Sequence, residues 1–164
     1  MTAPHRCAKD CRAYLLTPLF LPIAYAWVER QQRIVLAQGL PLSNAECADA
    51  RTIGVRAPER VRLLEVERIP LPAGRFIRAI ARATGLLASE SAGLTAGHGI
   101  LVHARHWRER ALVAHELVHV MQYQRLGGVR PFLRAYVYEC LRFGYAAAPL
   151  ELEAVEVGSQ FFFP

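Results

Sequence analysis

The chain has 164 residues, of which 53% are hydrophobic and 21% are charged. This length and composition predict one folded domain and exclude extensive disorder. The formal net charge is +6, but the arginines that carry it are dispersed along the chain without a recognisable nucleic-acid-binding motif, so no nucleic-acid partner is predicted.

The N-terminal stretch, residues 1–30, is interpreted as a hydrophobic arm that precedes the domain proper, residues 31–164. Three basic residues precede an uncharged run over residues 13–28, a pattern that resembles an export signal. Pro18 and Pro22 interrupt this run, which is also shorter than the roughly 20 residues of a membrane-spanning helix. We therefore favour an arm packed on a cytoplasmic protein, and an export signal or a membrane-associated anchor stays open as the alternative.

The sequence pattern of the first half of the chain predicts two helices and a strand. Residues 27–37 have the pattern of a helix with a mixed face. Ser43 and Glu46 have the spacing of a capping box, so a short helix is expected from there to Gly54. Residues 60–69 nearly alternate between polar and apolar side chains, which predicts a strand with one solvent-exposed face.

The second half of the chain is expected to be mainly helical. Apolar residues recur at helical spacing over residues 73–84, and a second strand is expected over residues 93–103. Helices then follow over residues 107–126, over residues 131–143 and from Pro149 onward. This order predicts an α+β fold with a small sheet and a helical C-terminal half.

An HExxH motif, His115 to His119, lies inside one of the expected helices. A spacing of four residues brings the two imidazoles to the same helical face one turn apart, where they can share one zinc ion. Glu116 lies beside them, in position to take a proton from a zinc-bound water. The motif has apolar neighbours, and unpartnered histidines there would cost desolvation energy that a bound metal removes. The motif therefore predicts a zinc site rather than two ordinary histidines.

A catalytic zinc usually has three protein ligands and one water, so a third ligand is needed. Neither histidine nor aspartate follows His119 in the sequence. The candidates downstream are four glutamates and one cysteine: Glu139, Cys140, Glu151, Glu153 and Glu156. Cys140 is the weakest of them, because its position within an expected helix suits a core thiol.

Four segments together resemble a bacterial family of uncharacterised HExxH proteins that are similar to gluzincins, the zinc metallopeptidases in which a glutamate on a later helix completes the site. They are residues 93–100, 115–128, 144–145 and 149–154. The resemblance implies a compact, zincin-like metallopeptidase domain with a helix that carries HExxH. The HExxH motif and the later glutamate are its specific features.

Carried over to this sequence, the gluzincin pattern Glu-x-x-Ala matches Glu151 and Ala154. The resemblance thus implies His115, His119 and Glu151 as the metal ligands, with Glu153 as the next candidate. The sequence departs from the family at Val155, where many gluzincins carry an aspartate that orients a histidine ligand.

The resemblance implies a peptide or protein substrate and a zinc cofactor. We expect Glu116 to activate a zinc-bound water for hydrolysis of the peptide bond, with Tyr145 and His98 as candidate catalytic donors to the developing oxyanion. Residues 97–103 are expected to form an edge strand that binds an extended peptide. The alternative is a non-catalytic, zinc-stabilised interaction or accessory module that uses the same ligands.

Overall fold

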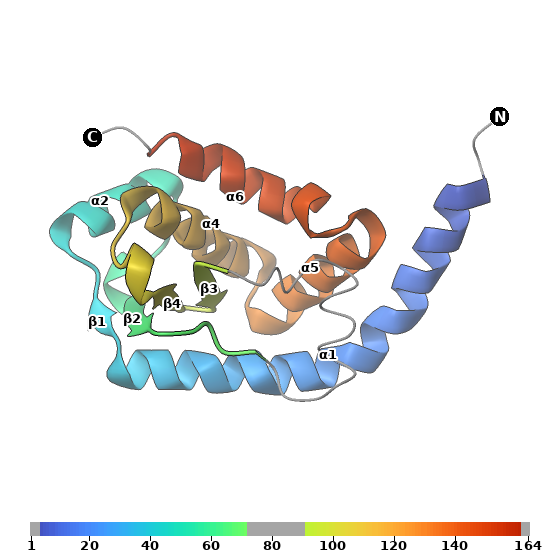
Figure 1. The fold of residues 1–164 in the computed structure, drawn as a ribbon, viewed down its shortest axis with the longest axis horizontal. Helices are drawn as coiled ribbons and strands as arrows, with labels where there is room; N and C mark the ends of the chain where they lie inside the picture. The colour runs from blue at the N-terminus through green and yellow to red at the C-terminus, as the bar shows by residue number, and fades with distance from the viewer. Residues whose placement is uncertain (1–3, 72–90, 162–164) are drawn as a thin grey trace.

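The computed structural model describes the backbone of residues 4–71 and 91–161, and the side chains of these ranges from residue 21 onward. This part of the chain is an α+β protein in which helices surround a four-stranded mixed sheet (Figure 1). The helices are α1 (Pro4–Gln38), α2 (Asn44–Ile53), α4 (Arg110–Leu126), α5 (Val129–Phe143) and α6 (Pro149–Ser159). The strands are β1 (Leu40–Pro41), β2 (Arg62–Val66), β3 (Gly93–Ala96) and β4 (Gly99–His103). The expected α+β class is confirmed, whereas the helix expected over residues 73–84 lies outside the described residues.

Helix α1 is one continuous helix of 35 residues, and the boundary expected at residue 30 falls inside it. It bends partway along its length (Figure 1), as expected for a helix in which Pro18 and Pro22 each remove a backbone hydrogen bond. Val28 and Val35 are buried, and Val35 lies directly against Gly99 of the sheet. The second half of α1 is therefore part of the core. Among the described residues, no helix is long and apolar enough to cross a bilayer.

The single strand expected over residues 93–103 is in fact a hairpin of β3 and β4. Ala96 pairs with Gly99, so Gly97 and His98 form a two-residue turn. Gly97 has φ 62°, a conformation that glycine adopts without steric cost and that two-residue hairpin turns require.

The strand order is β1-β2-β4-β3, with β4 parallel to β2 and antiparallel to β3. Strand β4 therefore lies inside the sheet. The expectation that residues 97–103 form the edge strand is wrong, because β3 occupies that edge.

The capped helix is confirmed at both ends. Ser43 Oγ accepts the backbone N–H of Glu46 at 3.2 Å, and the Glu46 carboxylate accepts the backbone N–H of Ser43 at 2.6 Å. Gly54 ends the helix in the left-handed conformation, with φ 97°. Local capping interactions therefore define both ends of this helix.

Helix α4, which carries HExxH, packs against the sheet. It begins at Arg110 rather than at residue 107, because Arg108 has φ 56° and interrupts the helical backbone before that point. Leu117, on the face toward the sheet, is fully buried in a core cluster that also contains Ile100 of β4 and Leu63 of β2. Leu117 of the motif therefore anchors α4 in the buried core beside the sheet.

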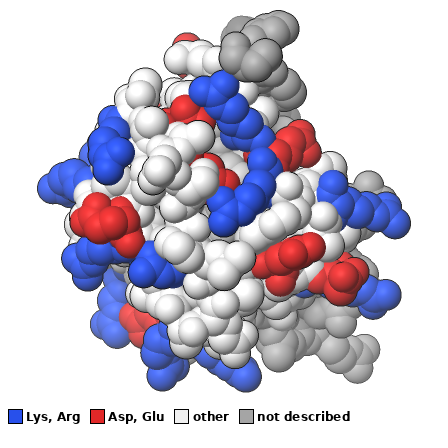
Figure 2. Space-filling view, turned by 90° about the vertical axis from the view of Figure 1, so that its left-hand side faces the viewer, with Lys and Arg blue, Asp and Glu red and all other residues white. Residues whose placement is uncertain are grey.

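Charged side chains of both signs are interspersed over the face shown in Figure 2. Some of the arginines are held in ion pairs with acidic residues. Arg108 pairs with Glu46, and the guanidinium of Arg110 lies 2.9 Å from Asp49. Pairs of this kind tie α2 to the start of α4.

Candidate metal centre

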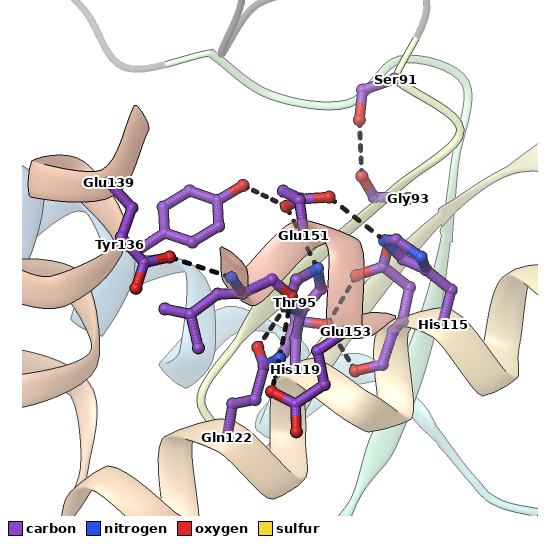
Figure 3. Close-up of polar contacts among 12 residues, drawn as sticks. Ser91, Gly93, Thr95, His115, His119, Gln122, Tyr136, Glu139, Glu151 and Glu153 are labelled. Atoms are coloured by element: carbon purple, nitrogen blue, oxygen red, sulfur yellow. Dashed lines mark hydrogen bonds and ion pairs between the residues drawn. The ribbon is translucent and has the colours of Figure 1, made fainter. Parts of the chain in front are cut away.

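Three potential metal ligands meet between α4 and α6 (Figure 3). His115 and His119 come from successive turns of α4, and Glu151 comes from the first turn of α6. Glu151 Oε2 lies 3.6 Å from His115 Nε2, and Glu151 Oε1 lies 3.3 Å from His119 Nε2. All the candidate ligand atoms lie within 4.8 Å of one another. Among the described side chains, those of residues 21–71 and 91–161, no other set of three such groups is brought together in this way.

Small residues on α6 allow the two helices to approach closely enough to bring these groups together. A Cβ at Gly158 would lie 3.1 Å from the Cβ of His115 and 3.2 Å from its backbone nitrogen. Ala154, one turn before Gly158 on the same helix, is fully buried. The position that the Glu-x-x-Ala pattern reserves for a small residue therefore lies in the helix interface, as that pattern implies.

The electrostatics of Glu151 and His119 are those of a buried ion pair. Burial alone lowers the pKa of His119, but its hydrogen bond with Glu151 and the charges of Glu116 and Glu151 outweigh burial and raise this pKa. Burial likewise favours the neutral acid at Glu151, but the hydrogen bond and charge of His119 lower its pKa. Both shifts favour a proton on His119 Nε2, between the imidazole and the carboxylate.

Two tyrosines surround the Glu151 carboxylate. The Tyr136 hydroxyl, from α5, donates a hydrogen bond to Glu151 Oε1. Tyr145 lies in a short 3₁₀ helix, Tyr145–Ala147, and burial together with the neighbouring Glu151 raises the pKa of its hydroxyl. Burial and Glu151 also raise the pKa of Tyr136. Both hydroxyls therefore keep their protons and remain hydrogen-bond donors at neutral pH.

Glu116, the expected base, is held against strand β3. Its side chain is only 5% exposed, and the Thr95 hydroxyl lies 2.6 Å from its Oε2 and 3.0 Å from its backbone carbonyl oxygen. A Cβ at Gly93 would lie 2.5 Å from Glu116 Oε1. Glycine at this position is therefore what leaves room for the carboxylate beside the sheet.

A chain of hydrogen-bonded polar side chains begins at His119 Nδ1, the ring nitrogen that faces away from Glu151. Its Nδ1 lies 2.8 Å from the Oε1 of Gln122, which is fully buried. The amide nitrogen of Gln122 donates to the backbone oxygen of Leu150 and to Glu153 Oε2, each at 2.9 Å. Glu153 in turn accepts two hydrogen bonds of 2.6 Å from the guanidinium of Arg125. Glu153 therefore lies outside the group of three candidate ligands but is linked to it by hydrogen bonds through Gln122.

The other sequence-derived candidates lie elsewhere. Glu139 accepts the backbone N–H of Leu150 at 2.9 Å and so caps the start of α6. His98 lies in the turn between β3 and β4, where its Nε2 is 3.1 Å from the amide nitrogen of Gln124, beyond His119 along α4. The structure does not bring His98 into the group of His115, His119 and Glu151.

Three residues of the site were not identified from the sequence: Thr95, Gln122 and Tyr136. Gln122 had a readable signal, because a residue three positions after His119 lies on the same helical face. Thr95 and Tyr136 reach the site from β3 and α5, and no pattern in the sequence indicated that they would do so. Val155 is 57% exposed, so an aspartate there would point into solvent rather than toward a histidine.

Two imidazoles and one carboxylate form a donor set that suits zinc and leaves a coordination position for water or substrate. The charge of the Glu116 carboxylate helps to raise the pKa of His119. The arrangement thus combines three candidate metal ligands with a buried carboxylate, that of Glu116, outside this group of three. The chain matches no protein-family model, no curated protein and no solved structure.

Proposed function

We propose that this protein is a zinc-dependent metallopeptidase with a zincin-like domain of the gluzincin type. The observation that carries the proposal is the meeting of His115, His119 and Glu151, whose ligand atoms lie within 4.8 Å of one another. These three residues would hold the ion. A bound zinc supplies a Lewis acid that polarises the scissile carbonyl and makes water more acidic.

Glu116 is the residue that moves protons in this proposal. Its carboxylate takes a proton from the attacking water and passes it to the departing amine. Thr95 and Gly93 keep the carboxylate in one orientation, the first through its hydroxyl and the second through its lack of a side chain. Tyr145, whose hydroxyl lies in hydrogen-bonding reach of Glu151, is the donor to the oxyanion in this proposal. His98 has no role in the proposal.

The substrate in this proposal is an extended peptide bound along β3. The His103 backbone N–H donates to the Ala92 carbonyl, and in antiparallel pairing residues alternate in the direction of their main-chain groups. Gly93 and Thr95 therefore direct theirs away from β4, toward the outer edge of the sheet. Their carbonyl oxygens already accept hydrogen bonds from the hydroxyls of Ser91, at 2.7 Å, and Tyr123, at 3.4 Å. A peptide there would therefore pair with these two residues mainly through their backbone N–H groups.

The experiment that tests the proposed function combines metal analysis with a peptide library. Protein purified under zinc-replete conditions is expected to carry about one zinc per chain and to cleave peptides from a broad library, with cleavage lost on chelation and restored by zinc. His115→Ala should lose both properties. Parent protein that remains metal-free in excess zinc would contradict the proposal.

Zinc affinity is expected to rise with pH. Because the pKa of His119 is raised in the folded protein, a proton occupies Nε2 below that pKa and must leave before a metal can bind. Affinity should increase by about tenfold per pH unit below the raised pKa and level off above it. Competitive chelator titrations at several pH values measure this, with His98→Asn as the matched control that should keep the same slope. An affinity that does not vary from about pH 5 to pH 8 would contradict the expected proton release.

A further inference from the structure

The amide of Gln122 has only one orientation that satisfies its contacts. One end of this side chain faces the backbone oxygen of Leu150 and the carboxylate of Glu153, both of which only accept hydrogen bonds. The amide nitrogen must therefore lie at that end. The amide oxygen must then face His119 Nδ1, 2.8 Å away (Figure 3).

This orientation fixes the position of a proton on His119. An amide oxygen only accepts hydrogen bonds, so Nδ1 has to be the nitrogen that carries the hydrogen. In a neutral imidazole the lone pair is then on Nε2, the atom that faces Glu151. The hydrogen bond that Nδ1 makes with Gln122 therefore leaves the Nε2 lone pair available to bind a metal.

Gln122 also connects the two helices that carry the ligands. It belongs to α4, whereas Leu150 and Glu153 flank Glu151 on α6. One buried amide therefore joins the backbone beside the carboxylate ligand to the ring of a histidine ligand. Arg125 completes the chain, because its two hydrogen bonds hold the Glu153 carboxylate in place.

We propose that Gln122 is a positioning residue that holds His119 in the Nδ1–H tautomer with Nε2 directed at the metal, and that Glu153, held by Arg125, sets the orientation of the Gln122 amide. This inference rests on the proposed function for the identity of the site. It assigns to a neutral amide the orienting contact that a carboxylate makes in many zinc sites.

The test compares Gln122→Met, which keeps the length of the side chain but forms no such hydrogen bonds, with the parent. Its matched control is Gln124→Met, on the same helix, whose amide contacts Arg56 and His98 instead of the site. The first readout is the nitrogen NMR shifts of the His119 ring in metal-free protein, above the pH at which the ring becomes neutral. The parent and Gln124→Met should show the Nδ1–H tautomer, and Gln122→Met should show a mixture.

The second readout is zinc affinity, measured by chelator competition. Gln122→Met is expected to bind zinc about 10 to 100-fold more weakly, the usual effect of losing a residue that orients a histidine ligand. Gln124→Met should bind like the parent. If Gln122→Met does not fold, Glu153→Ala serves instead. It should change the His119 tautomer and the zinc affinity in the same direction as Gln122→Met, by a smaller amount. Glu153→Gln keeps an acceptor oxygen, so its tautomer and zinc affinity should be close to those of the parent.

The outcomes separate this inference from the proposed function. If the parent protein does not bind zinc, the proposed function is overturned, and so is the role of Gln122 in directing Nε2 at a metal. The tautomer measurement still decides whether Gln122 orients the His119 ring. A parent that binds zinc, with a Gln122→Met variant that retains both the parent affinity and the Nδ1–H tautomer, overturns the inference and leaves the proposed function intact.

Discussion

Glu116→Gln is expected to abolish peptide hydrolysis while the protein still binds zinc. The amide has nearly the same shape as the carboxylate, and its oxygen can still accept the hydrogen bond from Thr95. It cannot take a proton from water, and loss of a general base typically costs about 10² to 10⁴-fold in rate. The turnover of a cleaved library peptide and the zinc content of the same preparation measure the two properties together.

The matched control for this variant is Glu156→Gln, an exposed glutamate on α6. It removes the same charge away from the site and should leave hydrolysis and zinc content at parental values. Glu116→Gln also separates the peptidase from the rival, a non-catalytic zinc module, because a module that only docks a partner needs no base. Full hydrolysis by Glu116→Gln would exclude the assigned role of Glu116.

Glu151→Ala should lose most of its affinity for zinc. Structural zinc sites bind with roughly 10 to 16 kcal/mol shared among four ligands, so removal of one ligand should weaken binding by about 70-fold to several hundred-fold. The change also leaves the protonated Tyr136 hydroxyl without its acceptor. Zinc affinity by chelator competition and the thermal unfolding of the metal-free variant distinguish loss of a ligand from loss of the fold.

Glu139→Ala is the informative control for Glu151→Ala. Glu139 caps the first turn of α6, so its loss should cost roughly 1 kcal/mol of stability and little zinc affinity. The opposite result, with parental affinity in Glu151→Ala and a large loss in Glu139→Ala, would show that the third ligand is assigned to the wrong helix.

The features that the sequence predicted correctly are those governed by local geometry. The spacing of His115 and His119 places two imidazoles one turn apart in any α-helix. The capping box at Ser43 and the stop at Gly54 are likewise set by nearest neighbours along the chain. The meeting of Glu151 with the two histidines followed from a family resemblance, because no local rule indicates which later helix faces α4.

The features that were missed depend on contacts between distant segments. Apolar residues lie on both sides of Gly97, at Leu94 and at Ile100 to Val102. This pattern did not reveal the turn between them, which depends on a positive φ at Gly97. The edge position of β3 depends on the parallel pairing of β2 with β4. The role of Gln122 required acceptors from Leu150 and Glu153, which are distant in the sequence.

The division of the donor groups between α4 and α6 also has a kinetic consequence. Helix α6 is the last described helix, and the carboxylate it carries reaches the histidines only while that helix is docked. One helix of a domain can undock without global unfolding, at a free-energy cost lower than that of unfolding the whole protein. An ion held by both helices would favour the docked state by mass action, and it would escape fastest during brief detachments of α6. The residence time of the ion would then be set by the packing at Gly158 and Ala154 as much as by the ligands themselves.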